Sequence, residues 1–357
     1  MIPERFMHPR PSSIVAALYT ARDLKVDVAI LHGPSGCSFK HARLLEEDGM
    51  RVLTTALGDN EFIFGGQKPL EEVLRYAEEH FSPKKMAVIG TCVSMIIGED
   101  LPSAIDSSGI TTPTIAVDIH AGFPENISGV LATLDAAKEA GWITEEELAR
   151  QHLLMGKANE VEKIRGAASQ AYIEPSRGDL KHVAAQRLIE CARSGAKGVA
   201  ILNAKKETAY MFADELIALH DACPGANITY IANLDKRGLP KVRADAERIR
   251  DEMAKRGVTL ELIGALDEYG ANGDALGARI RELSPVFALI AGVPHAIAPE
   301  YTNGIECFSV TNGPRQVAPL HAIGHEHVLV EIDLHPKTLG VREIVESEFG
   351  AVLRSIS

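Results

Sequence analysis

The feature that most constrains the fold is a repeated alternation of short apolar segments with helical segments. The apolar segments are rich in β-branched residues, and most of them end at a glycine or a polar turn. Continuous apolar runs of this length suit strands that are buried on both faces of a parallel sheet. The ten candidate strands are VDVAILHG (26–33), RVLTTAL (51–57), KMAVIGTC (85–92), PTIAVDI (113–119), GVAILN (198–203), ITYIAN (228–233), VTLELIG (258–264), VFALIAG (286–292), ECFSV (306–310) and HVLVEID (327–333).

Helical patterns lie between these strands. Segments 70–81 and 244–256 have apolar residues spaced near 3.6, and Gly257 is a suitable helix stop. Alternating strands and helices predict an α/β protein with two or three Rossmann-like domains, each a doubly wound parallel sheet. In such domains ligands bind at the carboxyl ends of the strands.

One stretch, residues 144–185, interrupts the alternation because it has no strand candidate and is mostly helical. Thr144 and Glu147 form a capping box at its start. We therefore predict an N-terminal α/β domain over 1–143, a helical connection over 144–185 and a C-terminal α/β region over 186–357. A further division of the C-terminal region near residue 265 stays open. The length of 357 residues agrees with more than one domain.

The charge and cysteine content exclude several classes of function. A net charge of −12 disfavours nucleic acid and anionic membranes as partners. No apolar run approaches the roughly 18 residues that span a bilayer. Prolines interrupt the N-terminal apolar stretch, so we expect no signal peptide. Five cysteines in a chain of this length then fit a reducing, cytoplasmic environment with free or metal-bound thiols.

Cys37 and Cys92 share one kind of environment. Each follows an apolar strand candidate with glycine close by, in HGPSGC (32–37) and IGTC (89–92). In a parallel sheet the two thiols could converge at one edge, and the glycines would admit a bulky ligand. We interpret both as candidate metal ligands. The alternative, that they are small buried apolar residues, stays open.

Histidines and the other cysteines give weaker signals. His32 and His41 flank Cys37, and His295 follows a strand end; these three are the candidate proton donors or catalytic residues. The histidines of HAIGHEH (321–327) run from helix into strand, so their side chains should diverge. Cys191 and Cys223 fit helical patterns.

Nucleotide-binding signatures are absent from the sequence. GPSGCSFK (33–40) lacks the spacing and the Lys-Ser/Thr ending of a phosphate-binding loop. GANGDALG (270–277) does not match the dinucleotide-binding pattern. Neither ATP hydrolysis nor hydride transfer from a nicotinamide is therefore expected of this chain.

Three motifs in order carry a family resemblance. HGPSGC (32–37), LGDNEFIFGGQKPLEEVL (57–74) and GTCVSMIIGEDLPS (90–103) resemble the α-subunit of nitrogenase component 1 and its relatives. The resemblance covers about the first 130 residues, and the second half resembles the family mainly in its α/β pattern. The short chains of that family look like the catalytic component of Ni-sirohydrochlorin a,c-diamide reductive cyclases, and the stretch HGPSGCSFKHARLLEEDG (32–49) resembles that component.

The resemblance implies an ATP-dependent reductive cyclisation. Ni-sirohydrochlorin a,c-diamide would be reduced by several electrons with closure of a γ-lactam ring, toward the nickel coenzyme of methyl-coenzyme M reductase. Nickel would enter only as part of the substrate. Electrons would come from a nitrogenase reductase-like iron–sulfur ATPase, which agrees with the missing phosphate loop here.

The resemblance also implies a cofactor. Cys37 and Cys92 match two cluster-ligating cysteines of the family, whereas residues 38–64 contain no counterpart of the third. A 4Fe-4S cluster takes four ligands, commonly thiolates. A homodimer in which each chain gives two cysteines would complete one cluster on its symmetry axis. A third ligand from the same chain is the competing arrangement, with candidates Asp59, Glu61 and Cys307.

The substrate implied by the resemblance carries many carboxylates, so its pocket needs basic side chains. Alternative functions are another nitrogenase-like tetrapyrrole reductase, a non-enzymatic scaffold for metal-cofactor assembly, or a binding module with structural cysteines. The substrate-binding candidates are Arg10, Lys40, Arg43, Lys205 and Lys206.

Overall fold

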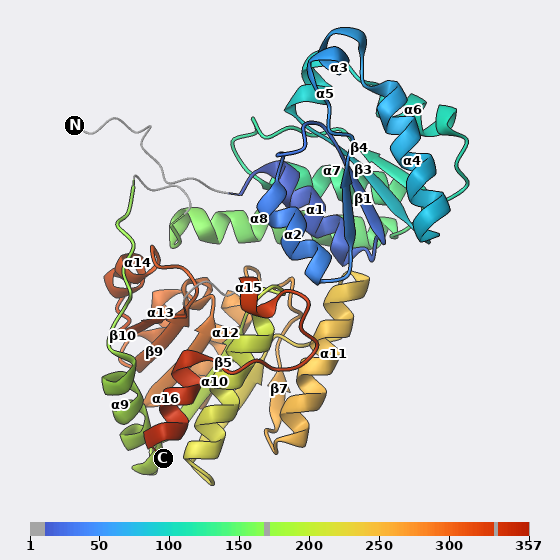
Figure 1. The fold of residues 1–357 in the computed structure, drawn as a ribbon. Coiled ribbons are helices and arrows are strands. Elements are labelled where there is room, and N and C mark those ends of the chain that lie inside the picture. The colour runs from blue at the N-terminus through green and yellow to red at the C-terminus, as the bar shows by residue number, and fades with distance from the viewer. Residues whose placement is uncertain (1–10, 168–171, 332–334, 357) are drawn as a thin grey trace, which may run out of the picture. The chain divides into compact units, whose positions relative to one another are not determined.

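The computed structural model describes residues 11–167, 172–331 and 335–356. Within them the chain forms two compact units, each built on its own parallel sheet (Figure 1). The N-terminal unit contains the described residues up to Leu153 together with Leu239–Lys241, and the other described residues form the C-terminal unit. The predicted α/β class with doubly wound parallel sheets is confirmed.

The sheet of the N-terminal unit has four strands in the order β2-β1-β3-β4, all parallel. Its strands are β1 (Val28–His32), β2 (Arg51–Thr54), β3 (Met86–Gly90) and β4 (Thr114–Val117). In the central pair the last residue of β1, His32, is aligned with the last residue of β3, Gly90. The segments that follow these two strands therefore leave the sheet side by side.

Helices cover both faces of this sheet. On one face α4 (Gln67–Phe81) and α6 (Leu101–Ser108) bury leucines and alanines against β1 and β3. On the other, α1 (Ser13–Asp23) and α7 (Ile127–Glu139) pack against each other, against β3 and against β4. Three further helices follow the carboxyl ends of strands: α2 (Phe39–Glu47), α3 (Asp59–Phe64) and α5 (Cys92–Ile97).

The sheet of the C-terminal unit has six parallel strands in the order β10-β9-β8-β5-β6-β7. A division near residue 265 would separate β8–β10 from β5–β7, which are hydrogen-bonded into this one sheet. The strands are β5 (Gly198–Asn203), β6 (Ile228–Ala232), β7 (Leu260–Leu262), β8 (Phe287–Gly292), β9 (Glu306–Thr311) and β10 (His327–Val330).

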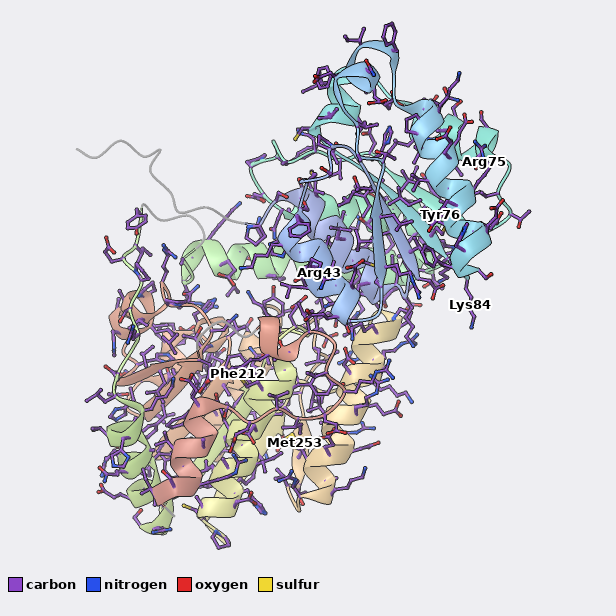
Figure 2. The ribbon with its side chains drawn as sticks, viewed as in Figure 1. Arg43, Arg75, Tyr76, Lys84, Phe212 and Met253 are labelled. Carbon is purple, nitrogen blue, oxygen red and sulfur yellow. The ribbon has the colours of Figure 1, made fainter. Side chains whose placement is uncertain are left out.

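Helix α12 (Gly273–Leu283) covers one face of this sheet, while α10 (Ala209–Ala222) packs against β5, β8 and α16 (Glu348–Ile356), and α16 against α9 (Lys181–Arg193). Phe212 of α10 and Met253 of α11 (Pro240–Lys255), both labelled in Figure 2, are fully buried. The remaining elements are α8 (Glu145–Ile164), α11 (Pro240–Lys255), η1 (Pro294–Ala296), α13 (Pro299–Thr302), α14 (Val317–Ala322) and α15 (His335–Thr338).

Each of the ten predicted strand ranges corresponds to one strand, although β9 extends to Thr311 and the segment 85–92 ends differently from the prediction. Its strand stops at Gly90, and Thr91 caps a helix that begins at Cys92. The Thr91 N–H donates to Ser94 Oγ at 2.7 Å, which turns the chain into that helix.

The connection predicted over 144–185 is helical only in part. Thr144 Oγ1 accepts the N–H of Glu147 at 3.2 Å and starts α8, as the capping box predicts. The helix ends at Ile164, residues 172–180 form no helix, and α9 begins at Lys181. In the part of the chain that the structure describes, no helix combines the length and the apolar character needed to cross a membrane.

Candidate functional site: two cysteines at one sheet edge

The carboxyl ends of β1 and β3 bring Cys37 and Cys92 to the same edge of the N-terminal sheet. Cys37 lies in the turn after β1, where its N–H donates to Pro34 O at 3.0 Å. Cys92 opens α5 directly after β3. A Cβ atom on Gly33 would overlap the side chain of Thr91, so only glycine lets these two segments lie in contact. The convergence predicted from the strand ends is therefore present.

The two thiols are half-buried and interact with each other electrostatically. Burial raises the pKa of the Cys37 thiol, a hydrogen bond with Ser38 offsets part of that effect, and the neighbouring Cys92 adds a smaller upward contribution. Cys92 Sγ accepts the backbone N–H of Ala121 at 3.3 Å. A backbone donor of this kind stabilises a thiolate, the form that binds metal.

Cys37 and Cys92 supply two of the four thiolates that a four-thiolate metal site needs. Among the described residues, no group of three or more His, Cys, Asp or Glu side chains is arranged to hold a metal ion. Glu61 Oε2 accepts the N–H of Gly58 at 2.8 Å and so caps its own helix, α3, in whose first turn Asp59 also lies. Cys307 is fully buried in the core of the C-terminal unit, where burial raises its pKa to about 12. Cys307 does not suit a cluster ligand.

Exposed large apolar side chains lie on the segments that carry the two cysteines and on the neighbouring helix α3, and we call them the apolar rim. They come from the start of α2, from α3 and α5, which pack against each other, and from the segment after Ala121. Ile63, Phe64 and Ile96 are 73%, 84% and 70% exposed. A concentration of large exposed apolar residues marks an interaction surface. The apolar rim consists of Phe39, Phe62, Ile63, Phe64, Met95, Ile96 and Phe123.

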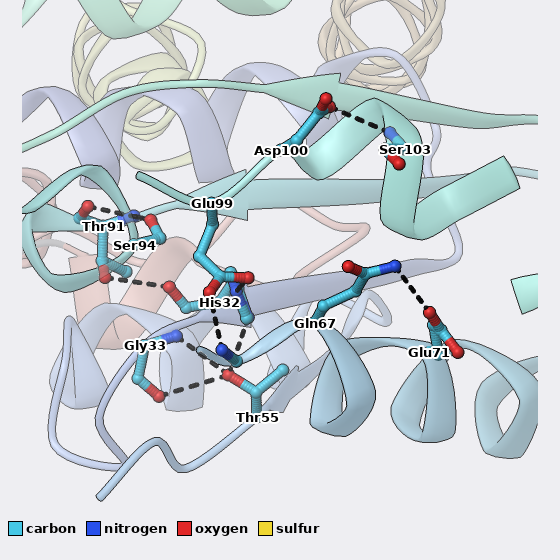
Figure 3. A network of polar contacts seen from close by, with 11 residues as sticks. His32, Gly33, Thr55, Gln67, Glu71, Thr91, Ser94, Glu99, Asp100 and Ser103 are labelled. Atoms are coloured by element: carbon cyan, nitrogen blue, oxygen red, sulfur yellow. Dashed lines mark hydrogen bonds and ion pairs between the residues drawn. The ribbon is translucent and has the colours of Figure 1, made fainter. Parts of the chain in front are cut away.

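The two histidines near Cys37, His32 and His41, both contact neighbouring side chains. His32 is fully buried, and its Nδ1 and Nε2 atoms lie 3.1 Å from Thr55 Oγ1 and 3.2 Å from Glu99 Oε2 (Figure 3). Burial lowers the pKa of His32, and Glu99 offsets part of that effect. His41, half-buried on α2, meets the ring of Tyr19 edge-on at 6.0 Å between centroids.

Two of the basic candidates lie on α2, in the same unit as the cysteines. Lys40 and Arg43 are exposed, and Arg43 forms an ion pair of 3.1 Å with Glu46 on the same helix (Figure 2). Because exposed pairs of this kind are weak, Arg43 can exchange Glu46 for another carboxylate at little cost. Arg10 lies outside the described residues.

The other two basic candidates, Lys205 and Lys206, follow β5 at the carboxyl edge of the C-terminal sheet. Lys205 Nζ lies 2.9 Å from Glu162 Oε1 and over the ring of Tyr269. Burial opposes the charge of Lys205, but Glu162 outweighs it and raises the pKa of the lysine. Burial alone would raise the pKa of Glu162, yet Lys205 and His295 hold it well below its usual range. The charge of Lys205 is thus already neutralised, whereas Lys206 has a looser contact of 3.9 Å with Glu207.

His295 is 3% exposed, and its Nε2 lies 3.5 Å from Glu162 Oε1. The histidines of residues 321–327 diverge as predicted: His321 faces Asp179, His325 bonds Ser309, and His327 bonds Glu306. Those three histidines therefore do not share a metal site.

Two parts of the site were not predicted from the sequence. Glu99 is one residue of the motif at 90–103 and gives no signal of its own in the sequence, although its carboxylate contacts both His32 and Gly66. The apolar rim was also missed. The run Phe62-Ile63-Phe64, set between a polar loop and a pair of glycines, was the available signal for it.

Comparison with known proteins gives matches over the whole chain. The family model described as nitrogenase component 1 type oxidoreductase matches residues 12–160, which include both cysteines. The CfbD component of the Ni-sirohydrochlorin a,c-diamide reductive cyclase complex from Methanosarcina acetivorans is 55% identical, over 98% of this chain and 97% of that protein. The component of the same name from Methanothermobacter thermautotrophicus is 50% identical, over 98% of each chain.

A solved structure, nitrogenase Cp1 at pH 6.5, aligns with 90% of this chain and 94% of its own at 12% identity. Its TM-score of 0.34 is too low to support a statement about the fold.

Proposed function

We infer that this chain, which belongs to the family of CfbD components of the Ni-sirohydrochlorin a,c-diamide reductive cyclase complex, is the catalytic component of such a complex. The observation that carries this inference is identity of 55% and 50% to two such components over nearly the full length of all three chains. The reaction is the ATP-dependent reductive cyclisation of Ni-sirohydrochlorin a,c-diamide, with nickel present only in the substrate.

The match to the nitrogenase component 1 family implies a metal–sulfur cluster. We propose that Cys37 and Cys92 of two copies of this chain hold one 4Fe-4S cluster between them. Three observations support this: the thiols are neighbours, Cys92 has a backbone donor, and the described residues offer no third ligand nearby. When bound, such a cluster accepts and passes on electrons one at a time.

The apolar rim supports the homodimer that this cluster requires. Most of its side chains lie on the segments that carry the two cysteines or on α3, which packs against α5, so a second copy seated there would bring its own pair of thiols close to them. Fully burying one large apolar side chain contributes about 1.5–3 kcal/mol, and the rim has several. The buried rim would also exclude water from the thiolates and from a cluster that they hold.

We further propose a nitrogenase reductase-like iron–sulfur ATPase as the electron donor. The sequence of this chain has no phosphate-binding loop of its own, so nucleotide hydrolysis would belong to that partner. For the carboxylates of the substrate, Lys40 and Arg43 are the better candidates, because they are exposed in the unit that carries the cysteines. Lys205 is a poorer one since Glu162 already neutralises it.

The test of the function is anaerobic turnover. The protein is mixed with the reductase partner, ATP, a reductant and Ni-sirohydrochlorin a,c-diamide, and the tetrapyrrole absorbance is followed. We expect a spectral change that depends on all four additions. A protein that holds its cluster and binds the tetrapyrrole without any spectral change would be a scaffold instead.

The test of the cofactor is its stoichiometry. For one 4Fe-4S cluster per homodimer we expect about two iron and two sulfide atoms per chain. Either Cys37→Ser or Cys92→Ser should lose the iron, whereas Cys191→Ser, a control outside the site, should keep it. A value near four irons per chain would contradict the shared cluster.

A further inference from the structure

A network of hydrogen bonds around His32 joins the segments that lead to the two cysteines (Figure 3). Its centre is His32, the last residue of β1, which is fully buried. Gly33 N–H donates to Thr55 Oγ1 at 3.0 Å, and this hydroxyl lies 3.1 Å from His32 Nδ1. The Thr55 hydroxyl can then donate to Nδ1, which leaves the proton of the neutral ring on Nε2, facing Glu99. Every polar atom of the ring is used.

Glu99 connects three segments of the chain through one carboxylate. One oxygen, Oε2, accepts from His32 at 3.2 Å, and the other, Oε1, accepts the N–H of Gly66 at 2.6 Å. The Glu99 side chain is only 7% exposed. Since a buried acceptor of two hydrogen bonds is costly to remove, this carboxylate fixes the end of β1, the segment after α5 and the start of α4 relative to one another.

Packing at Gly66 shows how closely these segments approach. A Cβ atom there would lie 2.9 Å from Leu57 Cδ2 and 3.0 Å from His32 Cε1. Both distances are shorter than ordinary contacts between carbon atoms. Thr91 Oγ1 adds a further link by donating to the carbonyl of His32 at 2.9 Å. The network is therefore a single packed unit.

Each segment that leaves this unit carries part of the site. The β1 segment continues to Cys37, and the segment that ends at Glu99 begins with α5 and Cys92. The segment that ends at Gly66 carries α3, with Phe62, Ile63 and Phe64 of the apolar rim.

We propose that His32 and Glu99 are a pair of positioning residues, which sets the two cysteines and the apolar rim in the arrangement that a shared cluster needs. This proposal rests on the proposed function for the identity of the cluster. The proximity of the two thiols, which the proposal explains, does not require a cluster and can be measured in the cluster-free protein.

The test measures thiol alignment in the protein without its cluster. Dibromobimane, a reagent that joins two neighbouring thiols, is added anaerobically, and the Cys37–Cys92 product is quantified by peptide mapping. We expect Glu99→Ala to lower the yield at least threefold, because it removes both hydrogen bonds of the carboxylate. Glu99→Gln keeps an acceptor for Gly66, and its amide can donate to His32 Nε2 once the ring proton moves to Nδ1, where Thr55 Oγ1 can accept it, so this variant should restore most of the yield.

The chain offers a matched control in the adjacent residue. Asp100 is an exposed carboxylate whose Oδ1 accepts the N–H of Ser103 at 3.0 Å, and it does not touch His32 (Figure 3). Asp100→Ala removes the same charge and should cross-link as the unaltered protein does. A folded Glu99→Ala protein that cross-links equally well would overturn the proposal.

Two further measurements separate the possible causes of failure. If Glu99→Ala does not fold, His32→Asn replaces it, since asparagine is too short to reach Glu99; unchanged cross-linking in that variant would also overturn the proposal. Iron content after reconstitution is measured in parallel. If the unaltered protein shows aligned thiols and holds no iron, the shared cluster is wrong while the positioning role stands.

Discussion

At the scale of single residues, the C-terminal unit contains a carboxyl group with no hydrogen-bond partner. Glu215 of α10 is fully buried, and neither of its oxygens has a partner among the described residues. Burial raises its pKa well above the usual range, and the charges of Glu331 and Asp214 add to that effect. Above the ordinary carboxyl pKa, the folded chain therefore holds this proton more strongly than the unfolded chain does.

This proton predicts how stability depends on pH. Above the unfolded pKa near 4.5 the unfolded state binds fewer protons, so this group lowers the free energy of unfolding by up to about 1.4 kcal/mol per pH unit. Glu215→Gln has no titrating carboxyl group at this position, so it removes this decrease in the free energy of unfolding. We expect the variant to be more stable at pH 7 than the unaltered protein, by a margin that shrinks toward pH 4.5.

Urea unfolding at several pH values measures this margin. Glu79→Gln, which changes an exposed glutamate of α4, serves as the control and should alter the free energy by less than about 0.5 kcal/mol at each pH. A margin for Glu215→Gln that does not vary with pH would show that Glu215 is charged in the folded protein.

At the scale of elements, two helical glycines play opposite roles. Gly129 of α7 faces α1 so closely that a Cβ atom would collide with the backbone oxygen of Ser13. Gly156 of α8 has no atom near its would-be Cβ and is exposed. The packing of α7 against α1 therefore requires glycine at position 129. Gly156 makes no such contact, and it only lowers the stability of α8.

The same substitution at these two glycines should have opposite effects. Gly129→Ala forces α1 and α7 apart, and we expect a loss of about 2 kcal/mol in the free energy of unfolding. Gly156→Ala should gain about 0.5–1 kcal/mol, because alanine restricts the unfolded chain and favours the helix. Denaturant titration of both variants measures the two changes in the free energy of unfolding. If both changes have the same sign, the roles assigned to the two glycines are wrong.

At the scale of the whole molecule, the proposed dimer depends on the apolar rim. Ile63→Asp places a charge on a side chain that is 73% exposed in the single chain and buried in the proposed dimer. Burying an unpaired charge is costly, so we expect the dissociation constant of the dimer to rise at least about tenfold. The iron content should fall with the loss of dimer.

Sedimentation of the anaerobic protein measures the dissociation. Val183→Asp changes a 55% exposed apolar residue on α9 of the C-terminal unit and should leave both the dimer and the iron unchanged. If Ile63→Asp remains as fully dimeric as this control, the second copy does not bind at the apolar rim.

The sequence by itself determined the α/β class, all ten strands and the position of both cysteines at strand ends. These features are local: a continuous apolar run predicts a buried strand, and the next few residues lie at the sheet edge. The cap at Thr144 was equally readable, because a capping box spans only four residues.

Only the tertiary structure decided which distant residues are partners. His32 meets Glu99 across 67 positions, and Lys205 is neutralised by Glu162 across 43, so neither contact leaves a mark on local spacing. Strand order decided that the region after residue 265 shares a sheet with β5–β7. Periodicity records which face of an element is buried, whereas the choice of partner depends on packing between elements that are remote in the chain.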